Sequence, residues 1–108
     1  MQSSQPAKIL GIHLLERDQF LGKPLYEAIV DKCRKFSIAG ATVFRGIEGY
    51  GDSAEIHRHH LLGHDQPLIV TIIDSEEKIR SLLPVLEEMM ETGLITVGDV
   101  EVVRITKK

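Results

Sequence analysis

The sequence lacks the features that mark secreted, membrane-spanning or nucleic-acid-binding proteins. Its 108 residues include one cysteine, Cys33, whose position on an apolar helical face suits a reducing cytoplasm. No apolar run approaches the roughly 20 residues that a membrane-spanning helix needs. The formal net charge of −3 leaves no basic footprint for nucleic acid. We therefore expect a cytoplasmic globular protein that does not bind nucleic acid.

Signatures of catalysis are also missing. The chain has no G-x-S-x-G nucleophile elbow, and Cys33 is predicted to be a core residue rather than a nucleophile. Glu48 and Glu55 have the chemistry of an acid and a base beside a histidine, but nothing in the sequence determines their separation. Surface carboxylates are the favoured interpretation, and the chain is predicted not to be an enzyme.

What is present is an ordinary globular composition. Hydrophobic residues make up 43% of the chain and charged residues 27%, and 108 residues suit one domain. The opening "MQSSQPA" lacks the basic and then apolar pattern of a signal segment. Residues 1–7 are expected to form a disordered tail, and residues 8–108 a single domain.

The first half of the chain predicts a strand, a helix and a second strand. "KILGIHLL" (residues 8–15) is apolar on both faces, and Pro24 suits the first turn of a helix, where its missing donor is not needed. Apolar residues then recur at near-helical spacing at Leu25, Ile29, Cys33 and Phe36. Gly40 is expected to mark a turn before the β-branched segment "ATVFRGI" (residues 41–47).

The second half also predicts a strand, a helix and a strand. "PLIVTIID" (residues 67–74) predicts a central strand, and Asp74 with Glu77 resembles a capping box that opens a helix. Pro84 is expected to kink this helix, and "DVEVVRIT" (residues 99–106) predicts a final strand. The buried stripe of the helix is predicted to comprise Ile79, Leu82, Leu83, Leu86, Met89 and Met90.

The order β-α-β-β-α-β predicts an α+β, ferredoxin-like sandwich: a four-stranded antiparallel sheet with two helices on one face. The strands carry more apolar residues than that one face accommodates. Self-association through the open face, giving a closed oligomer, is the simplest way to bury the remainder. The residues in question are Ile9, Leu14, Val43, Ile69, Val70, Ile73, Val102 and Val103.

Between the central strands lies "FRGIEGYGDSAEIHRHHLLGH" (residues 44–64), which is rich in histidine. Asp52 with Glu55 resembles another capping box, so "SAEIHRHHLL" is interpreted as a short helix. On such a helix His57 and His60 share a face, whereas His64 lies beyond a glycine stop. No cysteine lies nearby, and only two of the histidines share a face. His57, His60 and His64 are therefore weak candidates for metal ligands, and a solvated loop is favoured.

Glycines are the more specific feature of the connections. Gly46, Gly49 and Gly51 lie at the end of a predicted strand, where they let backbone amides approach a ligand closely. Gly93 and Gly98 are interpreted as surrounding the turn between the last helix and the last strand. If these connections face each other across an oligomer seam, they form a small-ligand site.

Several motifs along the chain resemble those of a known protein family. "GKPLYEAIV", "AGATVFRGIEGYG", "IIDSEEKI" and "GDVEVV" resemble the PII-like family called domain of unknown function 190, over about residues 8–105. More distantly, the second motif and "TGLITVGDVEVV" are similar to PII signalling proteins. That resemblance implies a homotrimer that binds an adenine nucleotide between subunits. It also implies a partner-binding loop at residues 49–66.

The resemblance further implies which residues form the nucleotide site. Thr42, Gly49, Tyr50 and Gly51 would line the adenosine. The turn glycines Gly93 and Gly98 are further candidates for the nucleotide site. Arg45 and Arg104 are the candidates for the phosphate side, with strand-surface charge as the alternative. Asp52 follows "GYG" where PII proteins carry a basic residue, so AMP or ADP is expected to be favoured over ATP.

Three functional hypotheses follow. The first is a non-catalytic sensor that reports an adenine nucleotide to a partner through the 49–66 loop; analogy with PII proteins points to a membrane channel or transporter as that partner. The second is a metal-binding regulatory protein that uses the His57–His64 cluster. The third is a small nucleotide-processing enzyme. No cofactor is required by the first hypothesis.

Overall fold

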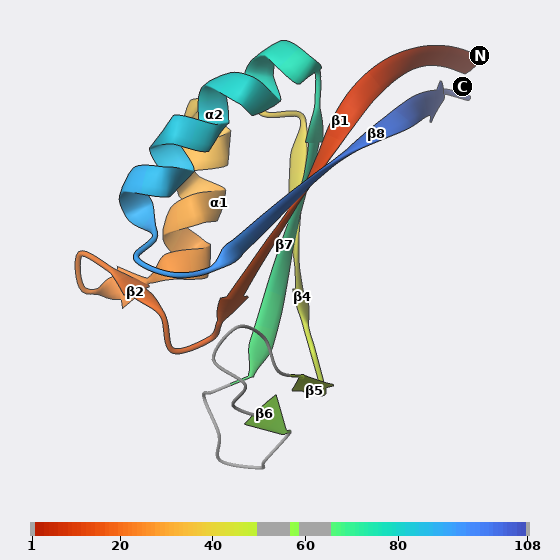
Figure 1. The fold of residues 1–108 in the computed structure, drawn as a ribbon. Helices are drawn as coiled ribbons and strands as arrows, with labels where there is room; N and C mark the ends of the chain where they lie inside the picture. Colours follow the sequence, from red (N-terminus) through yellow and green to blue (C-terminus); the bar gives the residue numbers. More distant parts are fainter. Residues whose placement is uncertain (1, 50–56, 59–65, 108) are drawn as a thin grey trace.

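The protein, described by a computed structural model, forms a single four-stranded sheet with two helices (Figure 1). The structure describes residues 2–49, 57–58 and 66–107. The main elements are β1 (Gln2–Leu15), α1 (Leu25–Lys35), β4 (Gly40–Arg45), β7 (Pro67–Asp74), α2 (Glu76–Met89) and β8 (Leu94–Ile105). Short strand pairs are β2 (Gln19–Phe20) with β3 (Lys23–Pro24), and β5 (Glu48–Gly49) with β6 (His57–Arg58).

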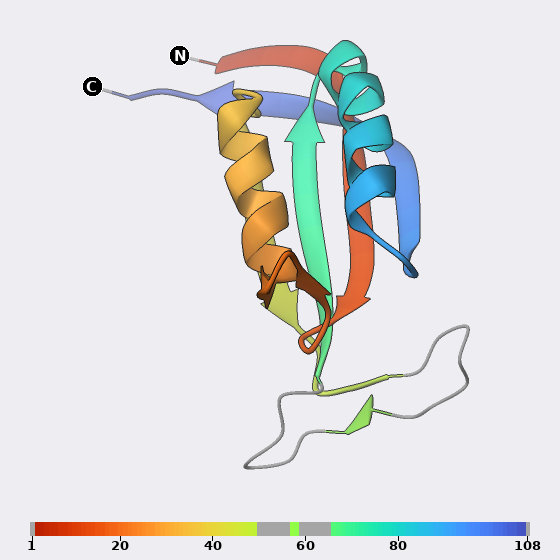
Figure 2. The ribbon, with the colours of Figure 1, turned by 90° about the vertical axis from the view of Figure 1, so that its left-hand side faces the viewer.

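The sheet has the order β4-β7-β1-β8, and its paired strands are antiparallel. Both helices cover the same face, as the turned view shows (Figure 2). This arrangement confirms the predicted ferredoxin-like α+β fold. Within the described residues, neither helix is long and apolar enough to cross a bilayer.

The core lies between the helices and the central strands. Alternate residues of β1 and β7 point toward the helices, and Leu10, Ile12, Val70 and Ile72 are completely buried. The predicted stripe of α2 meets them: four of its six members are buried and the other two pack against the core. The buried members are Ile79, Leu82, Leu86 and Met89; the partly buried ones are Leu83 and Met90.

The start of α2 differs from the prediction. Ser75, not Asp74, is the N-cap, and its Oγ accepts a hydrogen bond from the Lys78 backbone N–H at 3.3 Å. Asp74 ends β7 instead, where its Oδ2 accepts from the Ala39 backbone N–H at 2.8 Å. Asp and Ser are both good caps, and the long-range contact to Ala39 decides between them. The helix runs on through Pro84 to Met89.

The end of α1 also lies slightly apart from the prediction. Gly40 is the first residue of β4, and the left-handed turn residue is Ser37, with φ of 57°. Phe36 is the C-cap and is 39% exposed, so the buried face of the helix ends at Cys33. A turn of this hand is most often glycine, which is why the glycine signal pointed three residues too far.

The first and last strands of the chain, β1 and β8, are longer than predicted. β1 begins at Gln2, so the expectation of a disordered tail over residues 1–7 is corrected: Gln2–Ala7 pair with Val100–Ile105 and project from the body of the molecule (Figure 1). Backbone pairing of this kind needs no apolar side-chain pattern, so the polar opening gave no strand signal. β8 begins at Leu94, five residues before the predicted start.

Candidate functional site

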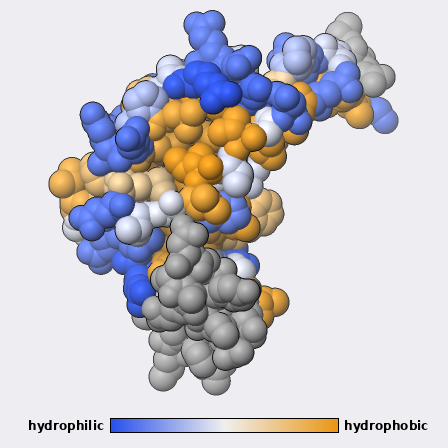
Figure 3. Space-filling view, in the orientation of Figure 1, coloured by the Kyte–Doolittle hydropathy of each residue, from blue (hydrophilic) through white to orange (hydrophobic). Residues whose placement is uncertain are grey.

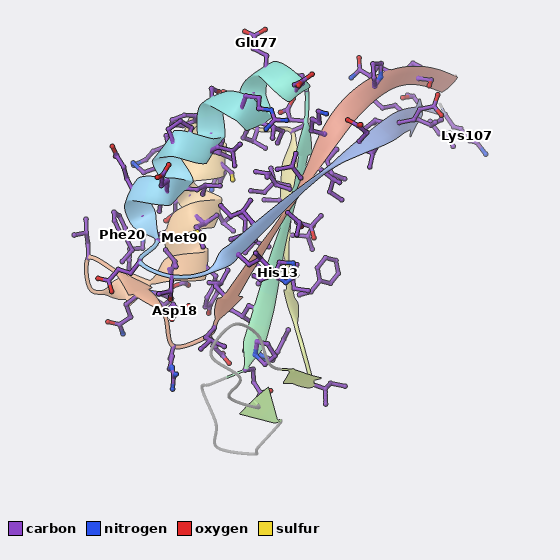
Figure 4. The ribbon with its side chains drawn as sticks, viewed as in Figure 1. His13, Asp18, Phe20, Glu77, Met90 and Lys107 are labelled. Atoms are coloured by element: carbon purple, nitrogen blue, oxygen red, sulfur yellow. The ribbon has the colours of Figure 1, made fainter. Side chains whose placement is uncertain are left out.

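The sheet face away from the helices presents three rows of side chains, each crossing all four strands in register. The first, called the apolar row, contains Phe44, Ile69, His13 and Leu94. The second, called the threonine row, contains Thr42, Thr71, Gly11 and Thr96. The third contains Gly40, Ile73, Ile9 and Gly98. Figure 4 shows His13 on the opposite side of the sheet from Met90, a residue that packs against the core.

The apolar row leaves large hydrophobic side chains in solvent. Phe44 is 55% exposed, Leu94 52% and Ile69 38%. The space-filling view shows a further apolar patch near the middle of the molecule (Figure 3). Val97 of β8 is 38% exposed. Rows of this kind mark interaction surfaces more often than isolated apolar residues do.

The structure divides several of the apolar strand residues between the two faces of the sheet. Val70 is fully buried under the helices, Leu14 is buried, and Val43 packs against the same core. Ile9, Ile69 and Ile73 do lie on the open face, according to the register. Both faces of these strands are apolar. The sequence therefore has no alternation of polar and apolar residues that could distinguish one face from the other.

The candidate ligand residues lie on opposite edges of the sheet. Thr42 and Arg45 belong to β4, whereas Gly98 and Arg104 belong to β8, and β7 and β1 separate these two strands. Arg104 pairs with Ser3 in the projecting part of β8, beyond the helices. One chain therefore does not bring the predicted residues together. They would meet only where the β4 edge of one copy lies beside the β8 edge of another.

Gly93 and Gly98 differ in what requires a glycine. Gly93 has φ of +146°, and a Cβ there would lie 2.4 Å from Met90 Cε and 3.2 Å from the His13 carbonyl oxygen. Packing within the chain explains this glycine. Gly98 lies inside β8 opposite Ile9, so the prediction that it surrounds a turn is corrected. A Cβ at Gly98 would meet only Ile9 Cγ2, at 3.4 Å.

Arg45 has a partner that the sequence did not reveal. Its Nη2 donates to Glu16 Oε2 at 2.5 Å, across the start of β7. Two backbone hydrogen bonds hold the same place: Gly46 N–H donates to the Pro67 carbonyl at 2.7 Å, and Glu16 N–H to the Gln66 carbonyl at 2.8 Å. The ends of the long connection are thus anchored to the sheet.

Part of that connection is a strand pair rather than a helix. Glu48–Gly49 pair with His57–Arg58, which corrects the helix predicted through His57. A capping-box pattern is a local signal, and pairing with a distant strand overrides it. Tyr50, Gly51, His60 and His64 lie outside the described residues, as does the side chain of His57.

Two further ion pairs shift the pKa values of three side chains, Asp99, Lys23 and Asp31. The Lys8 ammonium donates to Asp99 and lowers the pKa of that carboxyl group. The hydrogen bond between Lys23 and Asp31, at 2.8 Å, raises the pKa of the lysine and lowers that of the aspartate. No group of three or more potential metal ligands gathers within the described part of the chain.

The described hollows do not coincide with the candidate residues. The larger, of about 490 Å³, lies along the projecting strands and is lined by Ser4, Gln5, Pro6, Asp99, Val100 and Glu101. Cys33 is buried, and this burial raises the pKa of its thiol to about 11. A thiol in that state is not a nucleophile at neutral pH.

Together, the strand order, the two helices on one face and the open apolar row define a PII-like ferredoxin fold. The chain belongs to the family DUF190, described as an uncharacterized ACR, whose model matches residues 7–102. This confirms the family predicted from the sequence motifs.

Comparison with known proteins supports both conclusions. The chain is 43% identical to a UPF0166 protein of Aquifex aeolicus over 98 residues, covering 89% of this chain and 92% of the relative. It is 40% identical to a UPF0166 protein of Methanocaldococcus jannaschii over 101 residues, covering 89% and 91%. In fold it resembles CPII of Thiomonas intermedia K12, a nitrogen regulatory PII-like protein bound to ADP, AMP and bicarbonate. That similarity has a TM-score of 0.68 at 23% identity and covers 93% of this chain and 91% of CPII.

Proposed function

We propose that the protein is a non-catalytic PII-like regulator that binds an adenine nucleotide between the subunits of a homotrimer. The observation that carries this proposal is the separation of the candidate residues onto the two outer strands of one sheet. A site divided in this way becomes complete only between copies. Thr42 and Arg45 of one subunit would then face Gly98 and Arg104 of the next.

The open face supports the trimer. The apolar row exposes Phe44, Ile69 and Leu94 on a face that no helix of the same chain covers. Copies that turn this face inward bury these side chains, and each Å² of apolar surface removed from water contributes about 25 cal/mol. Heterologous contacts between unlike edges close into a ring when the rotation between copies allows it.

The charge of the edges favours AMP or ADP over ATP. The candidate residues include two basic side chains, Arg45 and Arg104, and Arg45 already forms an ion pair with Glu16. A triphosphate needs several positive partners to offset its charge. The ADP and AMP bound by CPII support the choice of an adenine nucleotide.

The 49–66 loop is the element that would report the bound nucleotide. Its ends are anchored to the sheet beside Arg45 by the Gly46–Pro67 and Glu16–Gln66 hydrogen bonds. A phosphate at Arg45 would therefore act directly on the root of the loop. By analogy with PII proteins, the partner would be a membrane channel or transporter in the same cytoplasmic compartment.

Sedimentation equilibrium and calorimetry test this function. We expect a mass of three times 12.1 kDa. AMP or ADP should bind at least as tightly as ATP, and no nucleotide should be turned over. A monomer that binds no adenine nucleotide would refute the proposal. Tight stoichiometric zinc or nickel binding would favour the metal-binding hypothesis, and product formation would favour the enzyme.

A further inference from the structure

The Glu16–Arg45 ion pair lies at one end of the sheet, on the side of the helices. Arg45 continues the helix-facing series of β4, after Ala41 and Val43. Glu16 follows the corresponding series of β1, which ends at Leu14. Because β7 lies between these two strands, the ion pair crosses β7 at the point where the long connection re-enters the sheet.

The two partners differ in their environment. The Glu16 side chain is 13% exposed, whereas that of Arg45 is 58% exposed. Glu16 Oε1 is buried and has no hydrogen-bond partner among the described residues, so the Arg45 guanidinium is the one described side chain that bonds this carboxylate. Glu16 is also held through its backbone N–H, which donates to Gln66. The carboxylate is therefore the anchored member of the pair.

Arg45 retains the capacity to bind a second anion. A guanidinium group has five N–H donors, and the ion pair with Glu16 uses the Nη2 end. The exposed part of the side chain is open to solvent beside Gly46, at the root of the loop. An anion that approaches Arg45 thus competes with a fixed carboxylate for the same charge.

We propose that Glu16 is a positioning and specificity-determining residue of the nucleotide site. It holds the Arg45 guanidinium at the root of the loop. Its negative charge also offsets the positive charge of Arg45, which would otherwise bind nucleotides with more phosphates more tightly. This inference rests on the proposed function, because Arg45 is its phosphate-side residue. The class of ligand selected is a nucleotide with few phosphates.

Glutamine at position 16 separates the two parts of this role. Glu16→Gln keeps an oxygen acceptor of the same reach for Arg45 but removes the negative charge, which frees the guanidinium for phosphate. Asp31→Asn is the matched control, since it removes the same charge from the exposed ion pair between Lys23 of β3 and Asp31 of α1. Both changes alter the net charge of the chain equally.

Calorimetry with AMP, ADP and ATP at fixed ionic strength is the main experiment. The ratio of ATP affinity to AMP affinity should rise about fivefold in Glu16→Gln, within the range expected for a partly exposed ion pair. Asp31→Asn should leave the ratio unchanged. In an Arg45→Gln background the Glu16→Gln effect should fall below about twofold, because screening by salt weakens what remains of the charge effect. A loss of stability alone would not move this ratio.

A parallel titration with inorganic pyrophosphate separates this inference from the proposed function. Binding is followed through the Arg45 guanidinium signal in nitrogen-15 NMR spectra, and it should be tighter in Glu16→Gln than in the unmodified chain. If no adenine nucleotide binds, the proposed function fails. The pyrophosphate result then still decides whether Glu16 limits the binding of phosphate groups at Arg45. If Glu16→Gln does not fold, Glu16→Asp takes its place, with a smaller change in the same direction. An unchanged nucleotide ratio and unchanged pyrophosphate affinity would overturn the inference.

Discussion

At the scale of single residues, burial and ion pairing decide which groups are chemically available. Cys33, in α1, is 2% exposed, and Asp99 and Asp31 carry lowered pKa values because each meets a lysine. None of these three residues was predicted to bind ligand, and their environments are structural. The environments of Cys33 and Asp99 each lead to a measurable prediction about the isolated protein.

Cys33 should be unreactive in the native protein. Its thiol is buried and its pKa is raised to about 11, so almost no thiolate forms at pH 8. We expect a thiol reagent such as dithionitrobenzoate to react slowly in buffer and rapidly in denaturant. Reaction in buffer at the rate seen in denaturant would contradict the buried position.

The Lys8–Asp99 pair should make stability depend on acid pH. The pKa of Asp99 is lowered from 3.8 in the folded protein, so the pair stabilises the fold above the unfolded pKa. That stabilisation is lost as pH falls through the folded pKa. In urea unfolding, Asp99→Asn should be less stable than the unmodified chain near neutral pH. The two proteins should converge as pH falls below 3.8 and through the lowered pKa of Asp99 in the folded protein. A constant difference across that range would contradict this assignment.

At the scale of elements, the connection from α2 to β8 shows how one glycine serves packing instead of ligand binding. Gly93 follows α2 with a positive φ, and a Cβ at this position would meet Met90 and the backbone of His13. The strand that begins one residue later carries Leu94 and Thr96 onto the open face. The close approach therefore positions the β8 edge of the sheet.

Replacing Gly93 should disturb this edge. Gly93→Ala should lower the free energy of unfolding by about 1–3 kcal/mol, because φ of +146° is unfavourable for alanine and the Cβ meets a backbone oxygen. Gly40→Ala is the control: nothing lies within 4 Å of its Cβ, and its φ is not positive. Equal urea midpoints for the two variants would show that the connection adapts.

At the scale of the whole molecule, the uncovered sheet face is the main feature left unexplained by a single chain. Two helices cover one face (Figure 2). By the strand register, the other face carries the apolar row beside the threonine row. The threonine row depends on a small residue at its centre. A Cβ at Gly11 would lie 2.8 Å from Thr96 Oγ1, which itself donates to the Gly11 carbonyl at 3.3 Å.

A charge in the apolar row should dissociate the proposed trimer. Ile69→Asp places a carboxylate in the middle of that row, where burial between copies would leave it unpaired. We expect monomers at micromolar concentration in sedimentation velocity, with nucleotide binding lost at the same time. Leu21→Asp is the control, because Leu21 is 88% exposed at the tip of the β2–β3 turn and away from the sheet. If Ile69→Asp remains trimeric, the open face is not the interface.

Local patterns in the sequence were sufficient for the two helices and the four strands of the main sheet, and for their order. The helical stripe from Ile79 to Met90 and the run Pro67–Asp74 were predicted as observed, and with them the fold and the family. These features depend on near neighbours: a repeat of 3.6 residues or a dense apolar run specifies its own element. The candidate edge residues Thr42, Arg45, Gly98 and Arg104 also came from motifs within single segments.

Only the tertiary structure decided which face each strand residue takes and which distant residues meet. Val70 and Ile69 have the same chemistry and adjacent positions, yet one is buried under the helices and the other lies on the open face. Glu16 and Arg45 are 29 residues apart: Glu16 follows β1, Arg45 ends β4, and β7 lies between these two strands. No local spacing encodes such a contact, because the pairing register of several strands together determines it.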